Sequence, residues 1–216
     1  MFAIGHFALG YLFGKASSKI AHVKVNLPLL LVASVLPDID LLLRFLMHRG
    51  PTHSLITLTV VIIPFFVIYR KRVIPYYAAL LSHVLIGDFF TGGIELFWPL
   101  AQGGFGALNF EVTSLPIVIA ELSLFCLTVP IMFKLGDLKS ILKHSNKNWA
   151  LIIPLGAVLG PLLALGRGQE TNLSTLLWVP SLFYIMLFAY SILVGLRGEH
   201  NQDKENPPPT KPFNPI

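Results

Sequence analysis

The sequence predicts an all-α protein, a polytopic bundle of about six transmembrane helices with a short N-terminal half-helix. Two observations favour this class. Apolar residues make up 54% of the 216 residues and charged residues only 12%, about half the charged fraction usual in soluble domains. The mean hydropathy is +0.71. A soluble core of this size could not bury so much apolar surface, so we expect a lipid bilayer to cover the remainder.

A helix needs about 20 apolar residues to cross a bilayer. The first apolar segment, Phe2–Gly14, is too short and predicts a half-helix or an interfacial segment. Six longer stretches approach or reach the spanning length: Asn26–Met47, Ser54–Tyr69, Val73–Leu100, Val112–Phe133, Trp149–Gly166 and Leu173–Leu196. Together they predict one membrane-embedded domain over residues 1–198. The polar, proline-rich residues 199–216 predict a disordered tail.

Two of these stretches are interrupted. Pro37 precedes Asp38-Ile39-Asp40 in the first, and Gly87-Asp88 followed by Gly92-Gly93 interrupts the third. Irregular backbone at membrane depth persists only where protein or a water-filled cavity covers it. Because both interruptions coincide with ionisable residues, they predict a functional site.

Basic residues predict the orientation. They gather in alternate loops and in the tail: Lys15, Lys19 and Lys24; Arg70, Lys71 and Arg72; Lys134, Lys139, Lys143 and Lys147; Arg197, Lys204 and Lys211. The positive-inside rule places these loops and the C-terminal tail in the cytoplasm, in a multi-pass protein of the inner or plasma membrane surrounded by membrane lipid. The same rule accounts for the net charge of +5, so we expect no nucleic-acid partner.

Histidines and aspartates gather in or beside the apolar stretches of the first 88 residues: His6, Asp38, Asp40, His48, His53, His83 and Asp88. Each ionisable group inside a span costs at least about 2.5–3.5 kcal/mol. Few cations are near, since Arg44 and Arg49 are the only basic side chains close by in the sequence. A divalent metal would neutralise the carboxylates and take the imidazoles as ligands. The predicted topology brings all these side chains into the outer half of the membrane.

The spacing within this group is mixed. Asp38 and Asp40 point to different sides of a regular helix and reach one ion only if the turn after Pro37 is broken. His83 and Asp88 lie about 140° apart on an ideal helix and share a site only if the backbone at Gly87 bulges or unwinds. Singly, each aspartate could instead be a helix cap or an interhelical hydrogen-bond partner. Glu121, in the fourth stretch, could support the metal ligands from outside, but we interpret it as simply hydrogen-bonded across helices.

Several motifs carry a resemblance to a known family: Gly5-His6-Phe7-Ala8-Leu9-Gly10, Leu36-Pro37-Asp38-Ile39-Asp40, His48-Arg49-Gly50-Pro51-Thr52-His53-Ser54, Ser82-His83 and Asp88-Phe89-Phe90-Thr91. Over about Met1–Leu100 the chain resembles the YdjM-like membrane-bound metal-dependent hydrolases, which are distantly similar to zinc-dependent phospholipase C. The resemblance implies metal ligation by His6, Asp38, Asp40, His48, His53, His83 and Asp88. The family usually has its histidine four residues before the aspartate, whereas His83 and Asp88 are five apart.

Four imidazoles and three carboxylates exceed the roughly three protein ligands of a catalytic zinc. The surplus fits two metals, or one metal with a general base. Mixed nitrogen and oxygen ligands favour zinc, with manganese or iron as alternatives. We therefore expect a metal-dependent hydrolase that attacks a phosphoester or lipid-like substrate near the outer interface through a metal-activated water.

The expected catalytic residues are Asp38, Asp40, Arg49 and Asp88. Asp40 would bind the metal with the histidines, Asp38 or Asp88 would accept the proton, and Arg49 would hold a phosphate. Alternatively, Arg49 pairs with an aspartate or reaches lipid headgroups. The competing function is an ion- or metal-coupled membrane transporter that uses the same cluster. A third is a membrane scaffold in which the metal is structural.

Overall fold

The computed structural model describes residues 1–41, 45–101, 103–163 and 174–205, with side chains described up to residue 197. The helices are α1 (Ala3–Ile20), α2 (Leu27–Val35), α3 (Leu55–Tyr69), α4 (Ile74–Ser82), α5 (Leu115–Lys134), α6 (Asp137–Leu142), α7 (Ile152–Leu162) and α8 (Trp178–Glu205). Among the described residues the β pairing is limited to one isolated bridge between Ile94 and Phe105. The all-α class is therefore confirmed.

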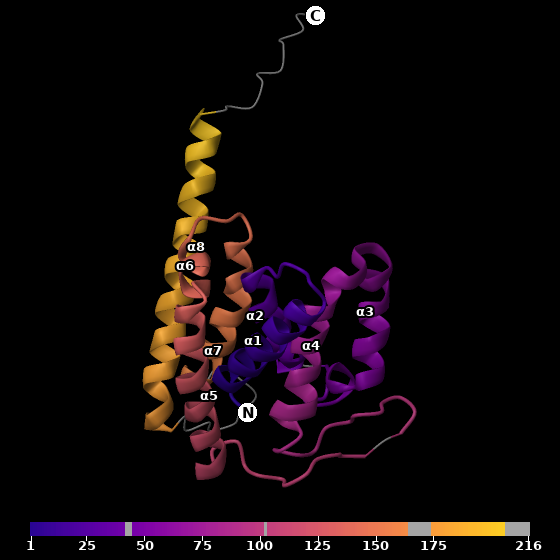
Figure 1. Ribbon diagram of the computed structural model, residues 1–216. Coiled ribbons are helices and arrows are strands. Elements are labelled where there is room, and N and C mark those ends of the chain that lie inside the picture. Colours follow the sequence, from indigo (N-terminus) through magenta and orange to yellow (C-terminus); the bar gives the residue numbers. More distant parts are fainter. Residues whose placement is uncertain (42–44, 102, 164–173, 206–216) are drawn as a thin grey trace, which may run out of the picture.

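Helix α1 lies at the centre of the molecule and packs against α2, α4 and α5 (Figure 1). All of its residues from Ala3 to Tyr11 are buried. The predicted half-helix over Phe2–Gly14 is thus too short, because α1 continues to Ile20. Small residues permit this central position, since a Cβ atom added at Gly10 would clash with Ser34 of α2.

Two of the six predicted spans are long enough and apolar enough to cross a membrane as single helices: Leu115–Lys134 and Thr175–Arg197. A third apolar helix, Asn148–Leu162, is shorter. The remaining stretches form shorter helices, with 9 residues in α2, 15 in α3 and 9 in α4. Six spans are therefore not confirmed.

The helices within Asn26–Met47 and Val73–Leu100 are broken where their ionisable residues lie. After α2 the chain tightens into a 3₁₀ turn over Leu36–Leu41. After α4 it widens into a π-helix over His83–Asp88 and then leaves helical structure. Both interruptions were predicted at these places.

Several sequence predictions fall on residues outside the described ones: Arg44, residues 164–173 and residues 206–216. Helix α8 runs to Glu205 and so extends into the predicted tail. The disordered tail over 199–216 and the domain boundary at residue 198 stay predictions.

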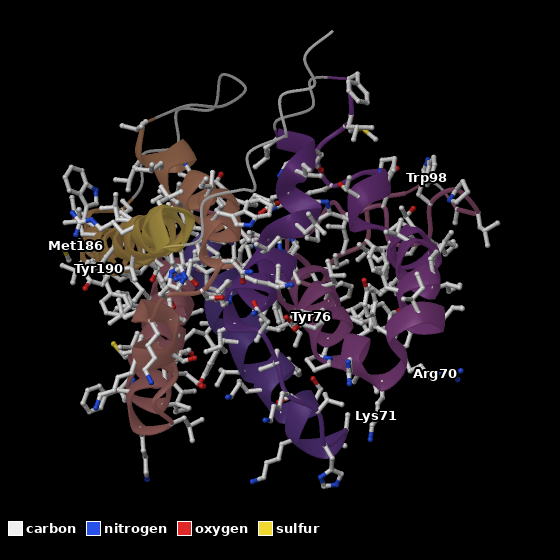
Figure 2. All side chains as sticks on the ribbon, turned by 90° about the horizontal axis from the view of Figure 1, so that it is seen from above. Arg70, Lys71, Tyr76, Trp98, Met186 and Tyr190 are labelled. Atoms are coloured by element: carbon white, nitrogen blue, oxygen red, sulfur yellow. The ribbon has the colours of Figure 1, made fainter. Side chains whose placement is uncertain are left out.

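Apolar side chains cover much of the outer surface. In α3, Leu58 and Ile62 are buried and most other side chains are exposed. On α8, Met186 and Tyr190 point away from the bundle and are 65% and 55% exposed (Figure 2). Helix α3 lies on the far side of the molecule from α5 and α8 (Figure 1). Such apolar faces on opposite sides suit a bilayer as solvent.

The chain directions bring the motif residues to one end of the N-terminal helices. Helix α1 begins there, α2 ends in the turn that carries Asp38, and α4 ends in the π-helix. The basic residues Arg70 and Lys71 lie at the opposite end, between α3 and α4 (Figure 2).

Candidate metal centre

Four side chains from three separate parts of the chain meet in one cluster, which we call the inner cluster: Asp38, His53, His83 and Asp88. Asp38 comes from the 3₁₀ turn after α2, and His53 ends a second 3₁₀ turn over Pro51–His53. His83 and Asp88 are the first and last residues of the π-helix. One ligand atom from each lies within 4.8 Å of all the others, so this group could hold a metal ion.

The distances within the inner cluster are nearly equal. His53 Nε2 lies 3.1 Å from Asp88 Oδ2 and 3.5 Å from Asp38 Oδ1. His83 Nε2 lies 3.4 Å and 3.5 Å from the same two oxygens. The two Nε2 atoms are 3.3 Å apart. Ligand atoms about 2.0–2.1 Å from one ion at tetrahedral corners are about 3.3 Å apart, so the spacing fits a single ion.

The π-helix explains how His83 and Asp88 can share a site although they are five residues apart. A π turn hydrogen-bonds residue i to residue i+5, so residues five apart come to lie one turn apart. His83 and Asp88 therefore face the same side, as expected if the backbone at Gly87 unwinds. A Cβ atom at Gly87 would lie 2.5 Å from Cε1 of His6. Glycine is thus needed here because the imidazole of His6 occupies that space.

Hydrogen bonds on the outer nitrogens orient both inner imidazoles. His83 Nδ1 lies 2.7 Å from the carbonyl oxygen of Ser34. A carbonyl only accepts, so Nδ1 carries the hydrogen and Nε2 presents its lone pair to the cluster. His53 Nδ1 lies 3.0 Å from the hydroxyl of Thr52, which donates to Asp40 Oδ2, and 3.3 Å from that carboxylate oxygen itself. Outer partners of this kind fix the tautomer and the ring orientation of metal-binding histidines.

Asp40 is fully buried and surrounded by donors. Its Oδ1 lies 3.0 Å from His48 Nδ1, and its Oδ2 accepts hydrogen bonds from Arg49 N at 3.0 Å and Thr52 Oγ1 at 2.8 Å. These hydrogen bonds hold the loop of residues 48–53 against Asp40 and so help to orient His53. Asp40 also forms a second possible metal-binding group with Asp38 and His48, again within 4.8 Å. Asp38 belongs to both groups.

His6 lies against the inner cluster, although it is not one of its four members. Its ring stacks on His83 with centroids 3.7 Å apart and planes 15° apart. Its Nε2 lies 3.6 Å from Asp88 Oδ1. Among the described residues, neither ring nitrogen has a hydrogen-bond partner, although the side chain is buried. Buried polar atoms without partners are rare and point to a missing ligand.

Arg49 connects the site to the segment after the π-helix. Its backbone has a positive φ of 61°. Its guanidinium donates to Gly92 O and Thr91 Oγ1, both at 2.8 Å, and lies 3.6 Å from Asp88 Oδ1. The two terminal nitrogens are therefore used within the protein, which fits the alternative interpretation of Arg49 as the partner of an aspartate.

The inner cluster carries an excess of negative charge. Burial lowers the pKa of His53, but hydrogen bonds with Asp38, Asp40 and Asp88 outweigh it and raise the pKa well above its usual 6.5. These carboxylates thus favour a cation, which a proton or a metal ion supplies.

Some contacts could not be read from the sequence. The Ser34 carbonyl has no sequence signal, because it acts through tertiary placement, and Thr91 lies in a quoted motif that does not indicate its contact with Arg49. Thr52 lies inside a quoted motif, and its hydroxyl donates to Asp40 Oδ2, whereas Ser54 caps α3. The Met1 amino nitrogen lies 2.9 Å from Asp88 Oδ1. The predicted interhelical hydrogen bond of Glu121 is confirmed, since its Oε1 accepts from Phe2 N at 2.5 Å.

Comparison with known proteins agrees with the resemblance seen in the motifs. The model of one family, described as YdjM inner membrane protein, matches residues 1–192. No curated protein and no solved structure matches the chain. The match extends well beyond the motifs of the first 100 residues and includes α5, α7 and most of the apolar part of α8. The chain therefore belongs to the YdjM inner membrane protein family.

Proposed function

We propose that this protein is a membrane-bound, metal-dependent hydrolase that acts on a phosphoester or lipid-like substrate. The supporting observation is the inner cluster, in which two oriented imidazoles and two carboxylates converge at distances of 3.1 to 3.5 Å. Direct charge-assisted hydrogen bonds are shorter, about 2.7–2.9 Å. The spacing thus suits ligands around an ion better than side chains bonded to each other.

The four side chains differ in exposure, and this difference suggests their roles. The side chains of His53 and His83 are 0% exposed and that of Asp88 is 3% exposed, whereas that of Asp38 is 19% exposed. We assign His53, His83 and Asp88 to the ion and leave Asp38 at the open side. A zinc-type ion held by these three residues would supply a Lewis acid that lowers the pKa of a water towards about 7. Asp38, at the open side, would accept a proton from the attacking water.

Asp40 and Arg49 support this arrangement from outside. Asp40 aligns His53, so it is a positioning residue in this mechanism. Arg49 holds Gly92 and Thr91, so it fixes the loop at the open side. Its Nε atom has no hydrogen-bond partner among the described residues and could donate to a phosphate oxygen.

The membrane orientation follows from the same placement. The cluster lies at the helix ends remote from Arg70 and Lys71, so the positive-inside rule puts it towards the outer face. We propose a multi-pass arrangement with a cytoplasmic C-terminus. A substrate with acyl chains would then reach Asp38 from the outer leaflet.

Elemental analysis of the detergent-purified protein is the first test. We expect stoichiometric zinc, manganese or iron in the wild type and none in His53→Ala. Hydrolysis of bis(p-nitrophenyl) phosphate and of phosphatidylglycerol vesicles then tests the reaction. Activity should disappear with a chelator, return with added metal, and be absent from Asp38→Asn although this variant keeps its metal. A wild type that holds metal but cleaves no phosphoester would contradict the hydrolase.

Transport is the competing function, and the same protein in sealed vesicles distinguishes it. A transporter needs polar groups that lead from the cluster to the opposite face. The polar residues that could form such a path are Glu121 and Thr128 of α5 and, further along the chain, Asp137. The hydroxyl of Thr128 is buried and has no hydrogen-bond partner among the described residues. Metal-ion or proton flux into vesicles that His53→Ala abolishes would favour transport over hydrolysis.

A further inference from the structure

We propose that Glu121 of α5 is a positioning residue for the metal centre, which it serves by holding the first turn of α1 so that His6 stands beside His83 and Asp88. This inference rests on the proposed function. It assigns a role in the site to a residue that lies outside the motifs and is separated from His6 by more than 100 residues of sequence.

The carboxylate of Glu121 caps α1. Its side chain is fully buried, and its two oxygens accept hydrogen bonds from Phe2 N at 2.5 Å and Gly5 N at 3.3 Å. The first N–H groups of a helix have no partner within the helix. Phe2, at the N-cap position, offers no side-chain hydrogen bond. Glu121 therefore supplies the cap that the sequence of α1 lacks, and its negative charge suits the positive end of the helix.

His6 belongs to the turn that Glu121 holds. It directly follows Gly5, and its own N–H donates to Phe2 O at 3.4 Å. Its ring stacks on the ring of His83 and lies so close to Gly87 that a Cβ atom there would be 2.5 Å from Cε1. Gly5 packs closely on Glu121, because a Cβ atom there would lie 3.1 Å from Cγ of Glu121, and its nearest neighbour would be Cε of Met1. A shift of the first turn would therefore carry His6 away from its place.

A second carboxylate holds the other part of α1. Asp137 accepts a hydrogen bond from the hydroxyl of Tyr11 at 2.6 Å and lies 2.9 Å from Nζ of Lys15. Glu121 and Asp137 thus fasten α1 at two points from the same part of the chain. Glu121 is the point next to His6, so its loss should change the metal centre, whereas the loss of Asp137 should loosen only the opposite half of the helix.

The test is cobalt binding to the detergent-purified full-length protein, because the visible spectrum of Co²⁺ reports the ligands around the ion. The variants are His6→Ala, Glu121→Ala, Glu121→Gln and the double variant His6→Ala/Glu121→Ala. Thr128→Val is the matched control, since Thr128 is also buried in α5 and its hydroxyl has no hydrogen-bond partner among the described residues. Size-exclusion chromatography checks that each variant is folded.

We expect Glu121→Ala to weaken cobalt binding by about 10–100-fold, the usual effect of losing a supporting residue. Its spectrum should change in the same direction as that of His6→Ala. The double variant should bind cobalt no more weakly than His6→Ala, because Glu121 acts through His6. Glu121→Gln should lie between the wild type and Glu121→Ala, since one amide oxygen can still accept a hydrogen bond.

Three results would overturn the proposal. The first is that Glu121→Ala binds cobalt as tightly as Thr128→Val. The second is that the loss of cobalt affinity in the double variant equals the sum of the losses in His6→Ala and Glu121→Ala. If Glu121→Ala does not fold, Glu121→Gln decides, and a wild-type spectrum and affinity for it would exclude a positioning role. Wild-type protein that binds no cobalt is a separate failure, since it would remove the metal centre and the proposed function together.

Discussion

Residues 1–114 and residues 115–197 use helices in two different ways. In the first region, α2 and α4 have 9 residues each and run directly into a 3₁₀ turn and a π-helix. In the second, Leu115–Lys134 and Thr175–Arg197 continue for 20 and 23 residues. A lipid-facing helix must satisfy its backbone groups internally, whereas a covered one can be broken. The breaks therefore occur where side chains from several helices meet.

The buried polar groups of the two regions differ in the same sense. In the first region the aspartates and histidines face each other. In the second, polar side chains bond to backbone atoms: Asn148 Nδ2 donates to Ser191 O at 3.1 Å, and Ser191 Oγ donates to Ile141 O at 2.9 Å. Such bonds join helices through the backbone. Among the described residues, the groups that could hold a metal ion therefore lie in the first region.

The largest effect should come from Asp88, which contacts both inner imidazoles. Asp88→Ala should lower metal affinity by more than about 100-fold, beyond the effect usual for supporting residues. The measurement is metal content after purification. Ser191→Ala, a buried polar substitution in α8, is the control and should keep its metal. Equal metal content in both variants would show that the inner cluster binds no ion.

A smaller effect is expected for Asp40, since it touches His53 from outside. Asp40→Asn places an amide among the donors His48, Arg49 and Thr52 and should weaken metal binding by about 10–100-fold. Titration against a chromophoric chelator measures this. Asp137→Asn should lower thermal stability and leave affinity unchanged. Complete loss of metal from Asp40→Asn, even at saturation, would instead make Asp40 a direct ligand.

Two glycine substitutions compare the regions directly. Gly87→Ala should displace His6 and weaken metal binding by about 10-fold, since a Cβ atom would lie 2.5 Å from the imidazole. Gly156→Ala, in α7, meets nothing within 4 Å and should stabilise the protein by about 0.5–1 kcal/mol. Metal affinity and thermal unfolding of both variants test the pair. Wild-type affinity in Gly87→Ala would mean that His6 does not contribute.

The smallest effect should come from the outer face of α8. Met186→Ala should change the free energy of unfolding by less than about 0.5 kcal/mol, because its side chain is 65% exposed. Phe188→Ala, at a fully buried position of the same helix, should cost about 3–5 kcal/mol. Unfolding in detergent measures both. A comparable loss for Met186→Ala would indicate that another chain packs on this face.

The sequence predicted the second region better than the first. The stretches Val112–Phe133 and Leu173–Leu196 correspond closely to Leu115–Lys134 and Thr175–Arg197, the two helices long and apolar enough to cross a membrane, because long uninterrupted apolar runs allow few other structures in a membrane protein. In the first region, apolar composition alone predicted Asn26–Met47 and Val73–Leu100 as two long stretches, although Pro37 and Gly87 interrupt them. The places of the breaks were predicted from these residues, but the short lengths of α2 and α4 were not.

Within the site, the sequence identified the residues but not all of their partners. The predicted histidines and aspartates do come together, because the helix directions bring their segments to one end. The different surroundings of the individual side chains could not be predicted from the sequence. Asp40 and Asp38 belong to one short motif, yet Asp40 is surrounded by donors and Asp38 faces the open side.

The amino-acid sequence by itself determined the all-α class, the membrane setting and the set of ionisable residues, since composition and local spacing specify these. The tertiary structure alone decided that α1 is central, that the Ser34 carbonyl orients His83 and that Glu121 caps α1 across 116 residues to Gly5. Those contacts depend on which helices pack together. Helices pack through surfaces that exist only once the chain has folded, so a local sequence pattern does not predict which helices will be neighbours.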